Sequence, residues 1–283
     1  MSTKRPIRVR KAINGVVTVM AGSAALFGLF MLLWILYVVL RKGASAINWS
    51  FLTSLPSPPG EAGGGIVNAI IGTLIITAVA TVMGVPVGML AGTYLAEFGR
   101  EGRFADAVRF VNNILIGAPS IVVGVFVYTL LVIPMGGFSG IAGAVALAII
   151  MLPVVTRTTE DMLKLVPDSL RESALALGAS EHRMITQVAF RAAKGGLITG
   201  VMLAVARVSG ETAPLLFTTL NSPYWSLALD KPMANLTVTI FNYAMSPYSD
   251  WQEKAWGASF LITTAVLGLN LTARFLARER RPR

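Results

Sequence analysis

Two charged residues interrupt one long apolar stretch of the chain. Arg207 and Glu211 are the only acidic or basic residues between Leu197 and Leu220. An arginine at the centre of a membrane helix costs about 2.5–3.5 kcal/mol on insertion scales, so such residues usually have a function. On a continuous helix, residues four positions apart share one face. We therefore expect both side chains on one helix face, with Arg207 near mid-span.

The guanidinium of Arg207 predicts an oxyanion as its ligand. A guanidinium stays charged at any accessible pH, and its forked donors fit two oxygens of an oxyanion. We expect phosphate to be the natural ligand of Arg207. We expect Glu211 to neutralise the cation partly when no anion is bound, and to repel a bound anion and so shorten its residence. An ion pair that only ties two helices together is the alternative interpretation.

Composition defines the class of protein that carries this pair. Hydrophobic residues make up 54% of the 283 positions and charged residues 13%, which excludes a water-soluble domain of this size. The chain has no cysteine, which excludes disulfides and thiolate metal sites. His182 is the single histidine, and we interpret it as an ordinary surface or packing residue. The sequence predicts an all-α, polytopic membrane protein without a metal site.

Six apolar stretches are candidates for membrane spans, each of which needs about 20 residues. The second stretch is longer than one crossing and contains Gly84, Pro86 and Gly88, which predicts a break and an interfacial continuation through Tyr94. The fourth is short and contains Pro153, but without it the two chain ends would lie on opposite sides. The six stretches are Ala12–Leu40, Ile66–Ala96, Phe110–Ile133, Phe138–Thr156, Leu197–Leu220 and Ala255–Ala273.

Positive charge predicts the orientation, because short cytoplasmic segments retain Lys and Arg. Most basic residues flank one side of the spans, and the other side has only Arg41, Lys42, Lys231 and Lys254. Both termini are therefore expected in the cytoplasm, and the net charge of +10 reflects topology rather than nucleic-acid binding. The first apolar run is too long for a cleaved signal and no small-residue cleavage site follows it. The basic residues of the predicted cytoplasmic side are Lys4, Arg5, Arg8, Arg10, Lys11, Arg100, Arg103, Arg109, Arg157, Lys164, Arg171, Arg183, Arg191, Lys194, Arg274, Arg278, Arg280, Arg281 and Arg283.

The two longer external loops differ in composition. The segment Gly43–Gly65 is rich in proline and glycine, which favours an irregular surface segment. The segment Asn221–Lys254 contains Tyr224, Trp225 and Trp251, which are typical of the membrane interface.

The longest cytoplasmic loop, Val166–Phe190, predicts two short helices. Pro167 begins the first, Gly178 suits its left-handed stop, and Ser180 caps the second. A helix this short is marginal alone, so its apolar stripe must rest against its own membrane domain or a separate protein. The stripe consists of Leu170, Ala174 and Leu177.

Within this loop, Glu172, Ala174 and Gly178 match the spacing of the EAA loop of ABC importer permeases. The resemblance implies that the first short helix docks into a groove on an ATPase subunit and transmits the closure of that subunit to the membrane helices. The loop departs from the family pattern at Ser173 and at Arg191, where the family has alanine and a Leu-Pro pair. An amphipathic connector on the membrane surface is the alternative.

The string ARVSGETAPLLFT, Ala206–Thr218, resembles the signature of the PstA family of phosphate permeases, and its core is Gly210–Phe217. The resemblance extends from Asn68 to Arg274 and includes APS at Ala118–Ser120 and LP at Leu152–Pro153. It implies the type I ABC importer permease fold. It also implies a complex with a second, PstC-like permease subunit, two copies of a PstB-like ATPase and an external PstS-like phosphate-binding protein.

These observations predict a multi-pass subunit of the bacterial inner membrane that forms half of the pathway of an ATP-driven phosphate importer. Residues 1–60 are expected to hold the tail, the first span and the start of the external loop, and residues 61–283 the permease core with the coupling loop 157–194. The P-loop string GxxxxGK[ST] is absent, so we expect no enzyme activity and no cofactor in this chain, with ATP and Mg bound by the partner ATPase.

Two other transport functions and one enzyme class are the alternatives to this prediction. One is a permease for another oxyanion, such as sulfate, molybdate or phosphonate. Another is an ion-coupled secondary transporter with Arg207 and Glu211 as its substrate and proton site, although such folds usually contain repeated halves that this sequence does not show. An intramembrane hydrolase lacks a plausible catalytic set, because there is no Cys, no HExxH and no pair of intramembrane aspartates.

Overall fold

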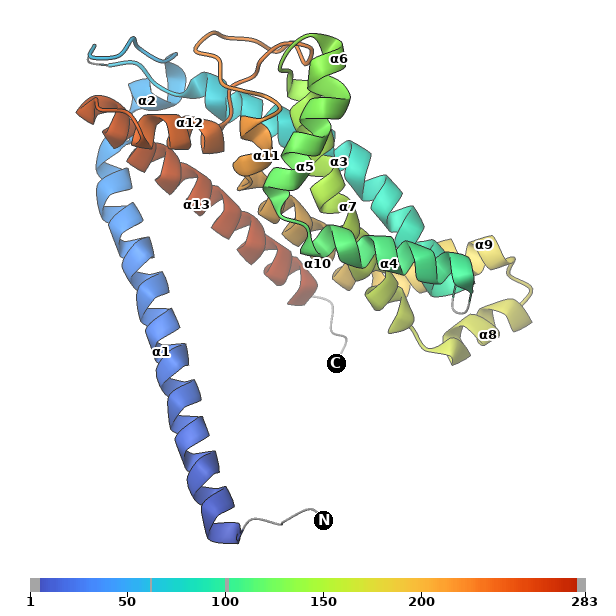
Figure 1. Cartoon of the computed structure of the whole chain (residues 1–283). Helices are drawn as coiled ribbons and strands as arrows, with labels where there is room; N and C mark the ends of the chain where they lie inside the picture. Colours follow the sequence, from blue (N-terminus) through green and yellow to red (C-terminus); the bar gives the residue numbers. More distant parts are fainter. Residues whose placement is uncertain (1–5, 62, 100–101, 279–283) are drawn as a thin grey trace.

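The computed structural model describes residues 6–61, 63–99 and 102–278, and over these ranges the chain folds into helices and loops without a β-strand (Figure 1). Five helices are long and apolar enough to cross a membrane, which confirms the predicted polytopic all-α class. The count rises to six if a sharply bent helix pair is taken as one span. The five are α1 (Ile7–Ala46), α3 (Val67–Thr93) with its π-helical extension η1 (Tyr94–Phe98), α7 (Gly140–Lys164), the continuous helix Glu181–Ser209 and α13 (Ser249–Arg278).

The predicted third span, Phe110–Ile133, corresponds to a bent pair of helices, which length and composition allow as one span. The chain forms α4 (Arg103–Gly117) and then a second helix at 104° to it, which consists of α5 (Ser120–Val127), η2 (Tyr128–Val132) and α6 (Ile133–Met135). Pro119 lies at the bend and forces the preceding Ala118 into an extended conformation. The helix after the bend is about 24 Å long, shorter than the roughly 30 Å hydrocarbon core.

α3 and α7 form the centre of the bundle. α3 runs unbroken past Pro86, so the predicted break in the second span is wrong. Its glycines instead let α7 approach closely: a Cβ atom added at Gly88 would lie 2.8 Å from the Cβ atom of Val155. The predicted span Phe138–Thr156 is present as α7, and 67% of its apolar window is buried. The surrounding core includes Ile76, Val127, Leu147, Met151, Val208 and Leu215.

The predicted fifth span ends earlier than expected. The helix that contains α9 (Glu181–Arg183), η3 (Met184–Ala189) and α10 (Phe190–Ser209) stops at Ser209, and the short α11 (Ala213–Leu216) follows. Both external loops also contain a short helix that the sequence did not predict, α2 (Trp49–Thr53) and α12 (Leu236–Ala244). Each begins with an asparagine whose side chain accepts a hydrogen bond from the helix N-terminus, Asn48 for α2 and Asn235 for α12.

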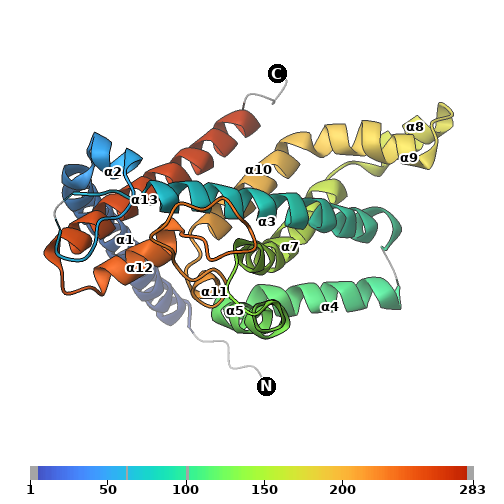
Figure 2. The same ribbon diagram turned by 90° about the horizontal axis from the view of Figure 1, so that it is seen from above.

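α1 stands apart from the bundle and contacts it only near its C-terminal end (Figures 1 and 2). There Gly43 lies against Trp256 and Phe260 of α13, close enough that an added Cβ atom would overlap both residues. None of the apolar window of α1 is buried within the chain. The surface of this helix must therefore be covered by lipid or by another protein.

The basic residues follow the predicted segregation wherever the structure describes them. α1 begins and α13 ends on the side of the bundle where α8 (Asp168–Ala176) lies, whereas α2 and α12 lie at the opposite end (Figure 1). Part of the predicted basic set lies outside the described residues, namely Lys4, Arg5, Arg100, Arg280, Arg281 and Arg283.

The close packing of α3 on α7 predicts that Gly92→Ala destabilises the protein. The new Cβ atom would lie 2.5 Å from the backbone oxygen of Thr156, and such overpacking costs about 1–3 kcal/mol. We expect a lower melting temperature in detergent. Gly22→Ala in α1 is the matched control, because no atom lies within 4 Å of its added Cβ atom. Equal melting temperatures for the two variants would contradict this packing.

Candidate functional site

Arg207 and Glu211 line one cavity of about 100 Å³ between α4, α5, α7 and the end of α10. Its walls come from the end of α10, the bend between α4 and α5, and the middle of α7. The APS and LP motifs both contribute to these walls. The remaining lining residues are Leu115, Ile116, Ala118, Ser120, Val123, Ile149, Ile150, Pro153 and Val154.

Arg207 lies in the last turn of α10, at the level of the central residues of α7 that line the same cavity. The end of α10 is capped by Gly210, whose N–H donates to the carbonyl oxygens of Arg207 and Val208. A helix C-terminus carries a partial negative charge, which favours a cation in its last turn. The helix end therefore stabilises the guanidinium, whose side chain is exposed on the surface of the single chain rather than sealed in packed protein.

Glu211 follows the helix end, so the expectation that it shares a helix face with Arg207 is wrong. Among the residues that the structure describes, no ion pair within 4.0 Å joins the two side chains. Glu211 is half-buried, and its carbonyl oxygen accepts a 2.8 Å hydrogen bond from the Thr237 hydroxyl of α12. The roles of Arg207 in anion attraction and of Glu211 as its countercharge remain predictions.

The α4–α5 bend is held against the rest of the site by two contacts. The Asn112 side chain of α4 donates a 3.3 Å hydrogen bond to the carbonyl oxygen of Pro153 in α7. Gly124 of α5 lies against α11, where an added Cβ atom would be 2.7 Å from the Cα atom of Pro214. The GETAPLLF string thus contains both the residue that caps α10, Gly210, and the short helix α11 that packs on α5.

The predicted coupling residues lie on and after α8. Gly178 has a φ angle of +81°, which confirms the predicted left-handed stop. Glu172 is exposed and Ala174 half-buried. Leu170 and Leu177 are 41% and 90% exposed, so α8 presents an apolar edge that the chain itself does not cover. The role of Glu172, Ala174 and Gly178 in contact with an ATPase stays a prediction.

The second predicted loop helix is not a separate helix. Ser180 does precede α9, but its side chain makes no capping hydrogen bond, and α9 continues through η3 into α10. The coupling loop is therefore joined directly to the helix that carries Arg207.

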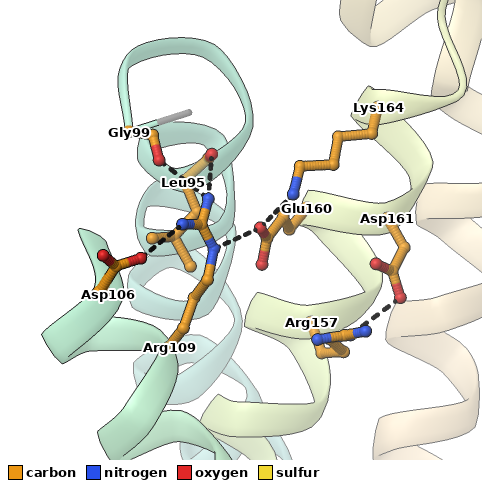
Figure 3. A network of polar contacts seen from close by, with 8 residues as sticks. All are labelled: Leu95, Gly99, Asp106, Arg109, Arg157, Glu160, Asp161 and Lys164. Atoms are coloured by element: carbon orange, nitrogen blue, oxygen red, sulfur yellow. Dashed lines mark hydrogen bonds and ion pairs between the residues drawn. The ribbon is translucent and has the colours of Figure 1, made fainter. Parts of the chain in front are cut away.

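A network of charged side chains, in which the Glu160 carboxylate is buried, surrounds the end of α3 (Figure 3). The Arg109 guanidinium of α4 donates to the Glu160 carboxylate of α7 at 2.9 Å and to the carbonyl oxygens of Leu95 and Gly99 at 3.1 and 2.8 Å. Lys164 binds the same Glu160 oxygen. Sequence reasoning treated Arg109 and Lys164 as markers of topology only, because no local pattern indicates which distant carboxylate each one meets.

A separate, buried ion pair joins α8 to the end of α3. The Arg171 guanidinium donates to both carboxylate oxygens of Glu97 in η1, at 3.1 and 2.8 Å. The two side chains are 8% and 4% exposed. A buried, bidentate pair of this kind fixes the orientation of both partners.

Residues 84–283 match the family model described as binding-protein-dependent transport system inner membrane component. The chain belongs to this family. It is a multi-pass inner membrane protein of a transport system that depends on a binding protein, which confirms the predicted class of permease.

Two relatives and one solved structure are similar to this chain over most of its length. The phosphate transport system permease protein PstA of Yersinia pestis is 51% identical over 94% of this chain and 90% of its own length. The PstA protein of Haemophilus influenzae is 47% identical over 99% and 100%. The permease fold is shared with the inward-facing MetNI methionine ABC transporter, with a TM-score of 0.61, 18% identity, and 77% and 95% of the two chains covered. This last similarity confirms the predicted type I importer permease fold.

Arg207 and Glu211, both among the described residues, line one cavity but form no ion pair within 4.0 Å, which predicts weak coupling between their contributions to stability. We expect the double variant of Arg207→Gln and Glu211→Gln to give an interaction energy of at most about 1 kcal/mol, well below the roughly 3–5 kcal/mol lost when a buried ion pair is broken. Chemical unfolding in mixed micelles measures the three variants. An interaction energy well above this limit would indicate a direct ion pair.

Proposed function

We propose that this chain is one of the two membrane subunits of an ATP-driven phosphate importer and forms half of its translocation pathway. The near full-length similarity to phosphate permeases carries this proposal, and the cavity beside Arg207 supports it. A guanidinium supplies fixed positive charge and forked donors for a tetraoxyanion. Sulfate, molybdate or phosphonate would suit the same cation, but the relatives favour phosphate.

The exposed position of Arg207 supports a partner in the membrane. A charge that faces lipid at mid-depth is costly, whereas a charge between two protein subunits can line a polar route. We infer that a second, PstC-like permease subunit covers this face, so that the pathway lies between the two chains. An external PstS-like binding protein delivers phosphate to the end of the bundle that holds α2 and α12.

The chain itself is inferred to be non-catalytic. ATP and Mg are bound by two copies of a PstB-like ATPase on the cytoplasmic side, where both termini and the basic residues of the α8 end lie. The apolar edge of α8 supplies the docking surface, with Glu172, Ala174 and Gly178 as its coupling residues. A separate ion-coupled mechanism is not favoured, because the family is that of binding-protein-dependent systems.

Arg207→Gln is predicted to abolish phosphate uptake while the complex still assembles. The variant keeps the size and polarity of the side chain but loses the charge that attracts the anion. Uptake of labelled phosphate in liposomes that contain the complex and its binding protein measures the effect, with co-purification as the test of assembly. Arg8→Gln at the exposed start of α1 is the control. Full uptake by Arg207→Gln would remove this residue from the mechanism.

Leu177→Ser is predicted to weaken binding of the ATPase subunit about tenfold or more, because burial of a leucine contributes about 1.5–3 kcal/mol. The side chain is 90% exposed, so the fold of the single chain should not change. Titration of the purified ATPase onto the reconstituted permease measures the affinity. Ile7→Ser, at an apolar site on α1 that is 71% exposed, should bind as the wild type does. Unchanged affinity of Leu177→Ser would exclude this edge as the docking surface.

A further inference from the structure

Arg171 uses all five of its N–H groups within the chain. Its Nε and Nη2 atoms donate to the two carboxylate oxygens of Glu97, and Nη2 also donates to the carbonyl oxygen of Leu163. Its Nη1 atom donates to the carbonyl oxygen of Val166 and to the Asp168 carboxylate. An arginine has five such donors, so the geometry is saturated. A lysine has three donors from one atom and cannot reproduce this fork.

The position of this guanidinium connects three elements. Arg171 belongs to α8, Glu97 to the π-helical end of α3, and Leu163 and Val166 to the end of α7 and the turn after it. α8 is otherwise a helix of nine residues with an exposed apolar edge. Without the guanidinium, the Glu97 carboxylate would be left buried and unpaired, which is costly. The pair therefore holds α8 in one orientation on the membrane domain.

The segment around Glu97 is also held from its other side. Arg109 of α4 binds the carbonyl oxygens of Leu95 and Gly99, which bracket Glu97 in the sequence, and pairs with Glu160 of α7 (Figure 3). α4 leads from this point to the bend that forms a wall of the Arg207 cavity. The end of α3 is thus linked by ionic and hydrogen bonds to α4, α7 and α8 together.

We propose that the Arg171–Glu97 pair is a latch that makes α8 and the end of α3 move as one body, and that the Arg109–Glu160 pair extends this motion to α4 and α7. A displacement of α8 by the ATPase then moves α4 and α7, which form walls of the Arg207 cavity, rather than only bending the loop around α8. The proposal rests on the proposed function for its transport readout. Arg171 and Glu97 act as positioning residues, since both side chains are buried within the chain and bind its own groups.

Transport stoichiometry tests the latch in the assembled complex. Glu97→Gln and Arg171→Lys are reconstituted with the ATPase and the binding protein, and phosphate uptake and ATP hydrolysis are measured in the same liposomes. We expect the phosphate moved per ATP hydrolysed to fall about tenfold in both variants, because Glu97→Gln removes the anionic partner and Arg171→Lys loses the bidentate fork. Arg157→Gln is the matched control, because it breaks an exposed Arg157–Asp161 pair on α7 that joins no other helix.

The internal geometry gives a second, independent test. The chain has no cysteine, so a pair of spin labels can be placed in one molecule at Ser173→Cys on α8 and Leu90→Cys on α3, both exposed. We expect Glu97→Gln to broaden the distance distribution between the two labels and Arg157→Gln to leave it unchanged. This measurement needs only the full-length chain and does not depend on which anion is transported.

The two measurements separate the possible failures. If the wild-type complex moves no phosphate, the proposed function fails, and the label distances still decide whether the latch exists. An unchanged distance distribution in Glu97→Gln would overturn the latch. A proportional fall of uptake and ATP hydrolysis, with the phosphate moved per ATP preserved, would also overturn it, because the pair would then serve stability only.

Discussion

A guanidinium that is nine-tenths buried needs an acceptor for each of its five N–H groups. In this protein that requirement brings the carboxylate of one helix and the carbonyl oxygens of another to a single side chain on α8. A parallel requirement at Arg109 joins α4, α7 and the end of α3. The α8 end of the bundle is therefore determined by charge pairing, whereas its centre is determined by glycine-mediated contact of α3 with α7.

One helix ends in the middle of the bundle. α10 stops at Ser209, and the chain turns through Gly210 and Glu211 before α11 begins. Irregular backbone at membrane depth is tolerated where it is enclosed by protein or lines a cavity. Here it does both, because Thr237 binds the carbonyl oxygen of Glu211 while the side chain of Glu211 lines the cavity. The partial negative charge at the C-terminal end of α10 stabilises the positive charge of Arg207.

Local signals predicted the local features well. The left-handed stop at Gly178 was predicted correctly because it depends on one residue and its neighbours. The bend of the third span at Pro119 was not predicted, because hydropathy averages over a window and does not register a bend. The Arg171–Glu97 pair spans 74 residues of sequence, and nothing in a single sequence indicates which distant carboxylate a given arginine meets. The cavity residues Arg207 and Glu211 were found because charge is rare in apolar stretches, but their relative geometry depended on where the helix ended.

α1 has a consequence for the surrounding bilayer. The apolar part of this 40-residue helix, Ala12–Leu40, is about 44 Å long, which exceeds the roughly 30 Å hydrocarbon thickness. Such hydrophobic mismatch is relieved by strong tilting, by local thickening of the lipid, or by both. Because α1 is fastened to α13 only near Gly43, its start can lean away from the bundle and carry Arg8 and Arg10 into the layer of anionic headgroups. Membrane thickness and lipid charge would then set the angle of this helix, independently of the transport cycle.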